Sequence, residues 1–120
     1  MMDSQELRDF CLSKPAVTED MPFDEHVLAF RVGGKIFALT NLSQEEFSVN
    51  LKAPPELITE WRELHPESVQ PGYHMNKKHW NTVYPNRGLN REMFFEMVGT
   101  SYKAVLSKLP AKVRKEITGD

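Results

Sequence analysis

The sequence predicts an α+β layer sandwich. Apolar residues recur with helical spacing in three segments, and other segments alternate between apolar and polar residues as strands do. The resulting order, helix, antiparallel strands, helix, strand, helix, contains no parallel crossover pattern. A length of 120 residues fits a single domain that can bury a core without disulfides or a structural metal.

The first helix is expected to begin at Asp3, a capping residue, with Glu6 in capping-box position three residues later. Leu7, Phe10 and Cys11 follow on one apolar stripe, and the next proline ends the helix. Cys11 is the only cysteine, which excludes an internal disulfide and a cysteine zinc cluster. Its place on the stripe favours a small core residue over a reactive nucleophile.

A β-hairpin is predicted around Gly33-Gly34, because two glycines suit a two-residue turn between alternating strands. In that register Arg31 pairs with Ile36 on one face. The buried face would carry two apolar pairs: Phe30 opposite Phe37, and Leu28 opposite Leu39. Alternation over residues 47–52 predicts a third antiparallel strand. Residues 21–25, ahead of the hairpin, are expected to form a loop or a short edge strand.

Two further helices are bounded by prolines. The second begins at Pro54-Pro55 and ends before Pro66. Its inward stripe is expected to contain Leu57, Ile58, Trp61 and Leu64. The third is the longest, begins after Asn90 as N-cap and ends at Pro110. Residues 110–117 are expected to add a short basic helix.

The stretch 71–83 is too polar for a core and too aromatic for a linker. From residue 79 onward it alternates like a strand, with Trp80, Thr82 and Tyr84 on one side and Asn81 on the other. Two interpretations stay open. The aromatic and cationic side chains suit a polyanion or a stacked base. Alternatively, the stretch is a structural turn with solvated lysines, in which Trp80 anchors the sheet to a helix.

Charge is distributed unevenly along the chain. Residues 1–67 carry a net charge of −7 and residues 68–120 carry +5, within a total of −2. No acidic residue occurs in two basic runs, 68–91 and 97–115. This polarity can orient a protein toward a polyanion, or it can be the solvated face of a dipolar protein.

Catalytic and metal-binding signatures are absent from the sequence. It contains no phosphate-binding glycine loop and no nucleophile elbow, and its four histidines have no neighbouring thiol or carboxylate cluster. We therefore expect no enzyme activity, no cofactor and no metal site. No apolar run approaches the roughly 18 residues of a membrane span, and no secretion signal is evident, so the expected location is cytoplasmic.

The run Pro71-Gly72-Tyr73-His74-Met75-Asn76-Lys77-Lys78-His79-Trp80-Asn81-Thr82-Val83 resembles the signature of the MmcQ/YjbR family of small bacterial proteins. Further segments agree in order and spacing: Met21-Pro22-Phe23, residues 30–38, Leu51-Lys52, Pro55-Glu56 and Ser101-Tyr102. The sequence departs from the family pattern at Asp24 and Ala53-Pro54. These departures affect turns and not the signature. The resemblance covers nearly the whole chain.

The resemblance implies a CyaY-like two-layer fold over residues 1–120, with a twisted antiparallel sheet and helices packed on one face. It also implies DNA binding, associated in the family with a double-wing arrangement of loops. We therefore predict a non-enzymatic bacterial DNA-binding protein, a monomer or weak homo-oligomer without an obligate protein partner. Its contact surface would be a basic turn and strand around residues 71–91, comprising Tyr73, His74, Asn76, Lys77, Lys78, His79, Asn81, Arg87 and Arg91.

Each candidate residue has an expected role. Lys77, Lys78 and Arg87 would contact phosphates, with help from Arg91. Asn76, His79 and Asn81 would donate or accept hydrogen bonds at sugars or base edges. The alternative is a protein-interaction or small-ligand module that uses the Tyr73–Trp80 surface, which a pocket bordered by Tyr73, His74 and Trp80 would favour. Metal handling, implied only by a likeness of fold to frataxin-like proteins, is the third alternative.

Overall fold

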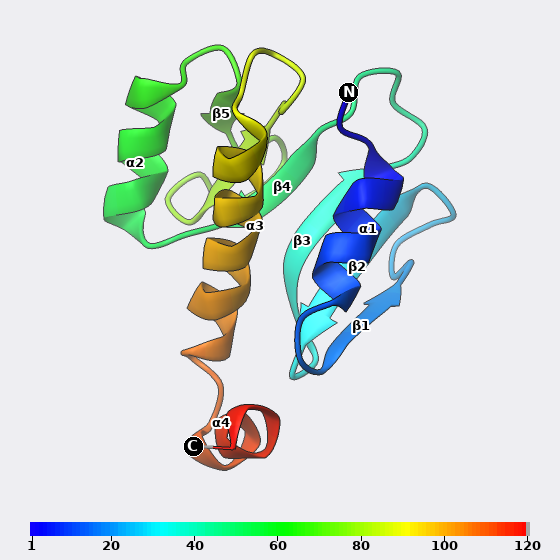
Figure 1. The fold of residues 1–120 in the computed structure, drawn as a ribbon, viewed down its shortest axis with the longest axis vertical. Helices are drawn as coiled ribbons and strands as arrows, with labels where there is room; N and C mark the ends of the chain where they lie inside the picture. Colours follow the sequence, from blue (N-terminus) through cyan, green and yellow to red (C-terminus); the bar gives the residue numbers. More distant parts are fainter. Residues whose placement is uncertain (120) are drawn as a thin grey trace.

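The structure is a computed structural model that describes residues 1–119 (Figure 1). These residues form a six-stranded, wholly antiparallel sheet in the order β1-β2-β3-β4-β6-β5, together with four helices. The strands are β1 (Val17–Asp20), β2 (Val27–Val32), β3 (Lys35–Asn41), β4 (Val49–Lys52), β5 (Val69–Pro71) and β6 (Trp80–Val83). The helices are α1 (Ser4–Leu12), α2 (Pro55–Leu64), α3 (Arg91–Leu106) and α4 (Ala111–Thr118).

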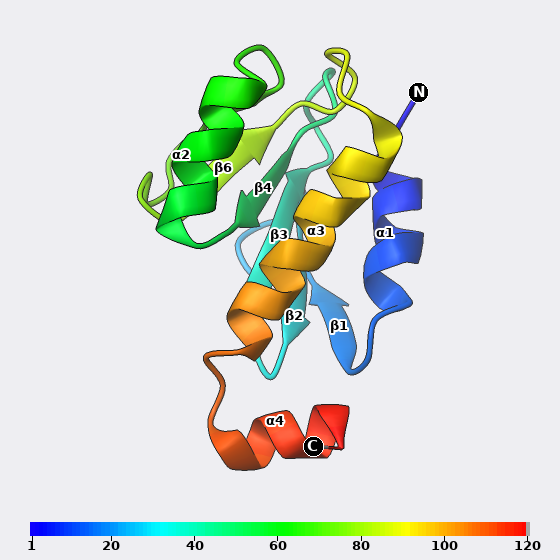
Figure 2. The same cartoon turned by 60° about the vertical axis from the view of Figure 1, so that its left-hand side comes forward.

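Three helices cover one face of the sheet, as Figure 2 shows. Helix α3 lies across β3 and β4, α2 packs on β5 and β6, and α1 lies beside β1. The opposite face of β2, β3, β4 and β6 carries no helix within residues 1–119. The α+β fold expected from the sequence is confirmed. We call the uncovered side of the sheet the open face.

The core lies between the sheet and the three helices. Phe30, Phe37 and Phe94 are fully buried there. The ring of Phe37 meets the ring of Tyr102 on α3 edge to face, with centroids 5.4 Å apart. Each such side chain contributes about 1.5–3 kcal/mol by leaving water, so this face carries most of the apolar stabilisation.

The N-terminal caps of α1 and α3 follow the sequence pattern, whereas α3 ends at Leu106 and not at Pro110 as predicted. Asp3 accepts a hydrogen bond from the Glu6 backbone nitrogen at 3.0 Å, and Asn90 caps α3 through Glu92 N at 2.8 Å. The predicted capping box is wrong, because the Glu6 carboxylate forms an ion pair with Arg91. Cys11 is buried as predicted, and its burial raises the pKa of the thiol to about 12.

The hairpin has its two-residue turn, but the predicted pairing beyond it is wrong. Arg31 lies opposite Ile36 as expected, and then Phe37 forms a β-bulge, so that Phe30 faces Ala38. The bulge shifts the following register by one residue: Ala29 pairs with Leu39 and Leu28 with Thr40. A shift of one residue reverses the side of the sheet on which a side chain lies. Leu39 therefore lies on the open face and not in the helix-covered core.

Some element boundaries also differ from those predicted. Leu64, assigned to the inward stripe of α2, is 63% exposed, because the stripe ends with the last buried residue, Trp61. The edge strand β1 precedes residues 21–25, which form a loop. The short strands β1 and β5 have too few apolar residues to give a strand pattern.

Within residues 1–119, no helix is both long and apolar enough to cross a membrane. The expected cytoplasmic location and oligomeric state stay predictions.

Candidate ligand-binding cleft

The β5–β6 loop, residues 72–79, is held in shape by its own backbone and side chains. Gly72 has no room for a side chain, since a Cβ there would lie 2.9 Å from the carbonyl oxygen of Trp80. The Asn76 side-chain oxygen accepts a hydrogen bond from Lys78 N at 2.9 Å, and its carbonyl accepts one from Trp80 N at the same distance. His74 has a left-handed backbone with φ of 58°, a strained conformation for a residue with a side chain.

Helix α2 fastens this loop to the covered side of the sheet. The guanidinium of Arg62 donates to the side-chain oxygen of Asn81 at 2.6 Å and to the carbonyl oxygens of Lys77 and Trp80. The Asn81 amide nitrogen donates to the carbonyl of Ile58 at 3.3 Å. Asn81 is only 2% exposed. The prediction that Asn81 contacts nucleic acid is therefore wrong, because its amide is buried and already bonded to α2.

Strand β6 alternates as the sequence predicts. Trp80, Thr82 and Tyr84 all line a cleft on the open face, whereas Val83 belongs to the core. Trp80 therefore does not anchor the sheet to a helix, as one interpretation had it. Its ring instead lies on the open face with the Lys52 ammonium 5.7 Å from its centroid.

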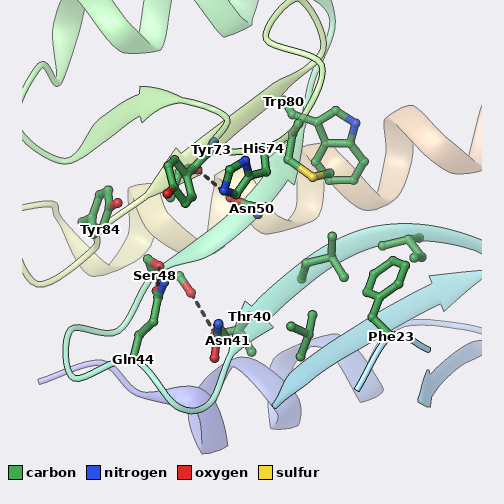
Figure 3. A pocket seen from close by; sticks show the side chains of 15 residues that line it. Phe23, Thr40, Asn41, Gln44, Ser48, Asn50, Tyr73, His74, Trp80 and Tyr84 are labelled. Carbon is green, nitrogen blue, oxygen red and sulfur yellow. Dashed lines mark hydrogen bonds between the residues drawn. The ribbon is translucent and has the colours of Figure 1, made fainter. Parts of the chain in front are cut away.

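The cleft on the open face has a volume of about 420 Å³ (Figure 3). Its floor comes from β2 and β3 and includes Val27, Ile36 and Leu39. The β5–β6 loop and β6 form one border with aromatic rings, including Tyr73, whose ring centroid lies 4.0 Å from that of His74. The remaining lining residues are Phe23, Thr40, Asn41, Gln44, Ser48, Asn50, Met75, Trp80, Thr82 and Tyr84.

A chain of hydrogen bonds crosses from the loop to the centre of the cleft. The backbone nitrogen of Tyr73 donates to the Thr82 hydroxyl at 3.0 Å, and that hydroxyl lies 2.6 Å from the side-chain oxygen of Asn50. A second contact joins β3 to the chain ahead of β4, where the Thr40 hydroxyl donates to the carbonyl of Ser48 at 2.8 Å. These bonds hold polar groups at defined positions on an otherwise apolar surface.

Two exposed aromatic side chains line the cleft. Phe23 and Tyr73 are 68% and 65% exposed. An apolar rim beside a concave surface is typical of a binding site.

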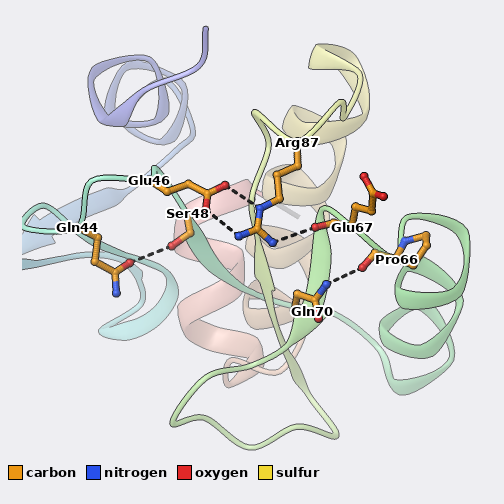
Figure 4. A network of polar contacts seen from close by, with 7 residues as sticks. All are labelled: Gln44, Glu46, Ser48, Pro66, Glu67, Gln70 and Arg87. Carbon is orange, nitrogen blue, oxygen red and sulfur yellow. Dashed lines mark hydrogen bonds and ion pairs between the residues drawn. The ribbon is translucent and has the colours of Figure 1, made fainter.

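The two arginines predicted to contact phosphate are engaged elsewhere. Arg87 makes a two-pronged ion pair with Glu46, with both N–O distances 2.7 Å (Figure 4). Its guanidinium lies 3.8 Å from the ring centroid of Tyr84. The Arg87 guanidinium holds the pKa of Glu46 below its usual value. Arg91 pairs with Glu6 and lies over Phe95. Arg87 therefore connects the turn after β6 to the loop after β3, and Arg91 connects α3 to α1.

Lys77 and Lys78 are exposed on the β5–β6 loop, and within residues 1–119 neither forms an ion pair with a carboxylate. The Lys77 ammonium donates to the carbonyl of Gly72 at 3.3 Å. The Asn76 side chain accepts a hydrogen bond within the turn, and His79 is half-buried in the same loop. Of the nine predicted contact residues, Tyr73 and His74 line the cleft, and Lys77 and Lys78 offer exposed charge nearby.

The two basic runs occupy different parts of the molecule. The β5–β6 loop of the first run lies beside α2, whereas the second run follows α3 into α4, beyond the end of the sheet (Figures 1 and 2). They do not form one continuous basic surface.

Sequence analysis did not predict several of the residues that line the cleft. Ser48 and Asn50 alternate with apolar residues along the third predicted strand. This alternation indicates that both polar side chains lie on the side of the strand away from the core, and it could have identified them as site candidates. Asn41 ends β3 and Gln44 lies in the loop that follows, and no sequence pattern connects either residue to residues 71–83. Across residues 1–119, no three His, Cys, Asp or Glu side chains form a group that could hold a metal ion.

The family model for YjbR matches residues 12–104. The chain belongs to the YjbR family. It is 32% identical to the uncharacterised protein YbdF of Escherichia coli O157:H7, over 97% of this chain and 98% of that protein. It is also 32% identical to the uncharacterised protein YjbR of Escherichia coli K12, over 95% of this chain and 96% of that protein.

Two solved structures share the YjbR-family fold of this chain. The crystal structure of Deinococcus radiodurans protein DR2400 superposes with a TM-score of 0.91 and 38% identity, covering 98% of this chain and 88% of that one. A protein from Pseudomonas syringae superposes with a TM-score of 0.71 and 26% identity, covering 87% of this chain and 99% of that one.

Proposed function

We propose that this YjbR-family chain is a non-enzymatic binding module whose ligand occupies the cleft on the open face. The observation that carries the proposal is the cleft itself, which borders the β5–β6 loop and is lined by Tyr73, His74 and Trp80. A flat, uniformly basic face would instead have favoured a nucleic acid duplex.

The chemistry of the lining supports a small, partly planar ligand. The volume of about 420 Å³ lies in the range of small-molecule sites. Aromatic side chains on the border can stack on a ring, and the apolar floor of Ile36 and Leu39 favours a ligand without charge at its buried end. None of the lining residues is Asp, Glu, Lys or Arg.

The test is a screen of small planar compounds by ¹H–¹⁵N NMR. Compounds that bind should shift the amide signals of residues 36–41, 72–76 and 80–84 together. Tyr73→Ala should weaken such binding about tenfold through the loss of ring contact. Leu64→Ala is the matched control, since Leu64 is 63% exposed against 65% for Tyr73 but lies outside the cleft. Equal loss in both variants, or shifts scattered over the surface, would contradict the proposal.

DNA binding is the second candidate function. It is favoured by the exposure of Lys77 and Lys78 without carboxylate partners in the described part of the chain, on a loop that also presents Tyr73 to the cleft. Lysine contacts to phosphate beside a ring that can stack on a base suit a single strand better than a duplex.

Fluorescence anisotropy with a single strand and a matching duplex tests this candidate. Binding should fall steeply between about 50 and 200 mM salt, and Lys77→Ala/Lys78→Ala should reduce the salt slope. Lys112→Ala/Lys115→Ala on α4 is the control, because it removes equal charge from the other basic run. Absence of binding at low salt would eliminate the candidate.

A further inference from the structure

We infer that the cleft selects neutral, planar heterocycles that carry a ring carbonyl, which deepens and rests on the proposed function. The inference comes from the orientation of the side-chain amides that line the cleft. In Asn41, Gln44 and Asn50 the side-chain oxygen accepts a hydrogen bond from another group of the protein. Each amino end makes no hydrogen bond to another group within residues 1–119.

The orientation of Asn41 is fixed by a backbone donor. Its side-chain oxygen accepts from Ser43 N at 2.9 Å and from the Ser43 hydroxyl at 2.7 Å. A backbone N–H can only donate, so the atom that faces it must be the amide oxygen. The amino group of Asn41 is thereby left to bind an acceptor in the cleft that this residue lines.

The orientation of Asn50 follows from the bonds of Thr82. The Thr82 hydroxyl accepts from Tyr73 N and lies 2.6 Å from the Asn50 side-chain atom, a separation typical of an O–H···O bond and short for N–H···O. Its proton therefore goes to the Asn50 oxygen, and the Asn50 amino group is left as a donor. The Gln44 oxygen lies 3.3 Å from the Ser48 hydroxyl, a separation too long to fix the orientation of that amide, so the inference rests on Asn41 and Asn50.

A site with several amide donors and no charged lining residue complements a neutral acceptor. A carbonyl oxygen can accept from amide N–H groups without the cost of burying a charge. A carboxylate would lose its hydration, and no Lys or Arg lines the cleft to offset that loss. The ring that bears the carbonyl would stack on the aromatic border formed by Tyr73 and Trp80.

Two compounds of one shape test the inference: indole, which has no carbonyl, and 2-oxindole, which adds one to the same bicyclic frame. Binding is followed by ¹H–¹⁵N NMR, which also resolves the side-chain NH₂ signals of Asn41 and Asn50. We expect 2-oxindole to bind about tenfold more tightly than indole, and to shift at least one of these NH₂ signals.

Asn50→Asp sharpens the test, because the carboxylate still accepts from Thr82 but replaces the amino donor with an oxygen. The preference for 2-oxindole over indole should fall by at least about threefold in this variant, because the carbonyl of 2-oxindole loses an amide donor. Glu45→Gln, an exposed substitution outside the cleft lining, serves as the charge-change control.

The outcomes separate the inference from the proposed function. Equal binding of both compounds in the cleft would overturn the carbonyl preference and leave the binding module intact. An unchanged preference in Asn50→Asp, with Asn41 signals also unmoved, would likewise overturn the inference. Binding of neither compound at millimolar concentration would contradict both.

Discussion

Neighbouring residues of the same two strands meet opposite environments in this protein. On β4, Val49 and Leu51 are buried in the core, whereas Asn50 between them lines the cleft. On β6, Val83 is buried in the core and Thr82 lines the cleft. One side of the sheet therefore carries most of the folding stability, and the other carries the groups suited to recognition. Substitutions on the two sides should have separable effects.

The largest contrast is expected between two phenylalanines. Phe37 is fully buried against Tyr102, whereas Phe23 is 68% exposed at the cleft rim. Phe37→Ala should lower the free energy of unfolding by about 3–5 kcal/mol through lost burial and a cavity. Phe23→Ala should change it by less than about 0.5 kcal/mol. Urea denaturation measures both, and similar losses would mean that the two faces share the stabilisation.

Two asparagines give the next contrast. Asn81→Ala should destabilise the protein by about 1–3 kcal/mol, because it removes the buried hydrogen bonds that Asn81 makes with the Arg62 guanidinium and with the carbonyl of Ile58. It should also speed hydrogen exchange in residues 72–80, which Arg62 holds to α2. Asn41→Ala removes bonds in an exposed loop and should cost less than about 1 kcal/mol. An equal cost for both, or unchanged exchange in Asn81→Ala, would contradict this assignment.

The smallest effect should come from the exposed ion pair of Glu46 and Arg87, which joins the loop after β3 to the turn after β6. The folded-state pKa of Glu46 lies below its unfolded value, so the pair stabilises the fold above the unfolded pKa. This contribution is lost as the pH falls through the folded-state pKa. Glu46→Gln should therefore lower the Tm slightly at pH 7, and the difference should shrink as the pH falls below the usual glutamate pKa and as salt is added. A difference that is independent of both pH and salt would exclude the ion pair as its source.

Sequence reasoning recovered the features that depend on local chemistry. Caps such as Asp3 and Asn90, the turn at Gly33-Gly34 and the alternation of β6 are encoded within a few residues of each other. Tyr73 and His74 were likewise placed in the candidate site because they lie in one distinctive stretch.

The features that were missed depend on contacts distant in sequence. Arg87 and Arg91 were expected to be free cations, yet their partners Glu46 and Glu6 lie 41 and 85 residues away in the chain. The orientation of Asn50 depends on Thr82, 32 residues later. Charge counts and periodicity carry no information about such pairs, because the tertiary fold alone brings them together.

The bulge at Phe37 has a consequence in molecular evolution. It places Phe37 and Ala38 among the core residues, while Leu39 turns to the cleft floor. An in-frame deletion of the codon for residue 37 would restore simple alternation, in which Ala38 takes the buried position and Leu39 keeps its own. The phenylalanine would be lost from the core while the cleft floor was preserved. We therefore expect such a deletion to act through the packing of the core under α3.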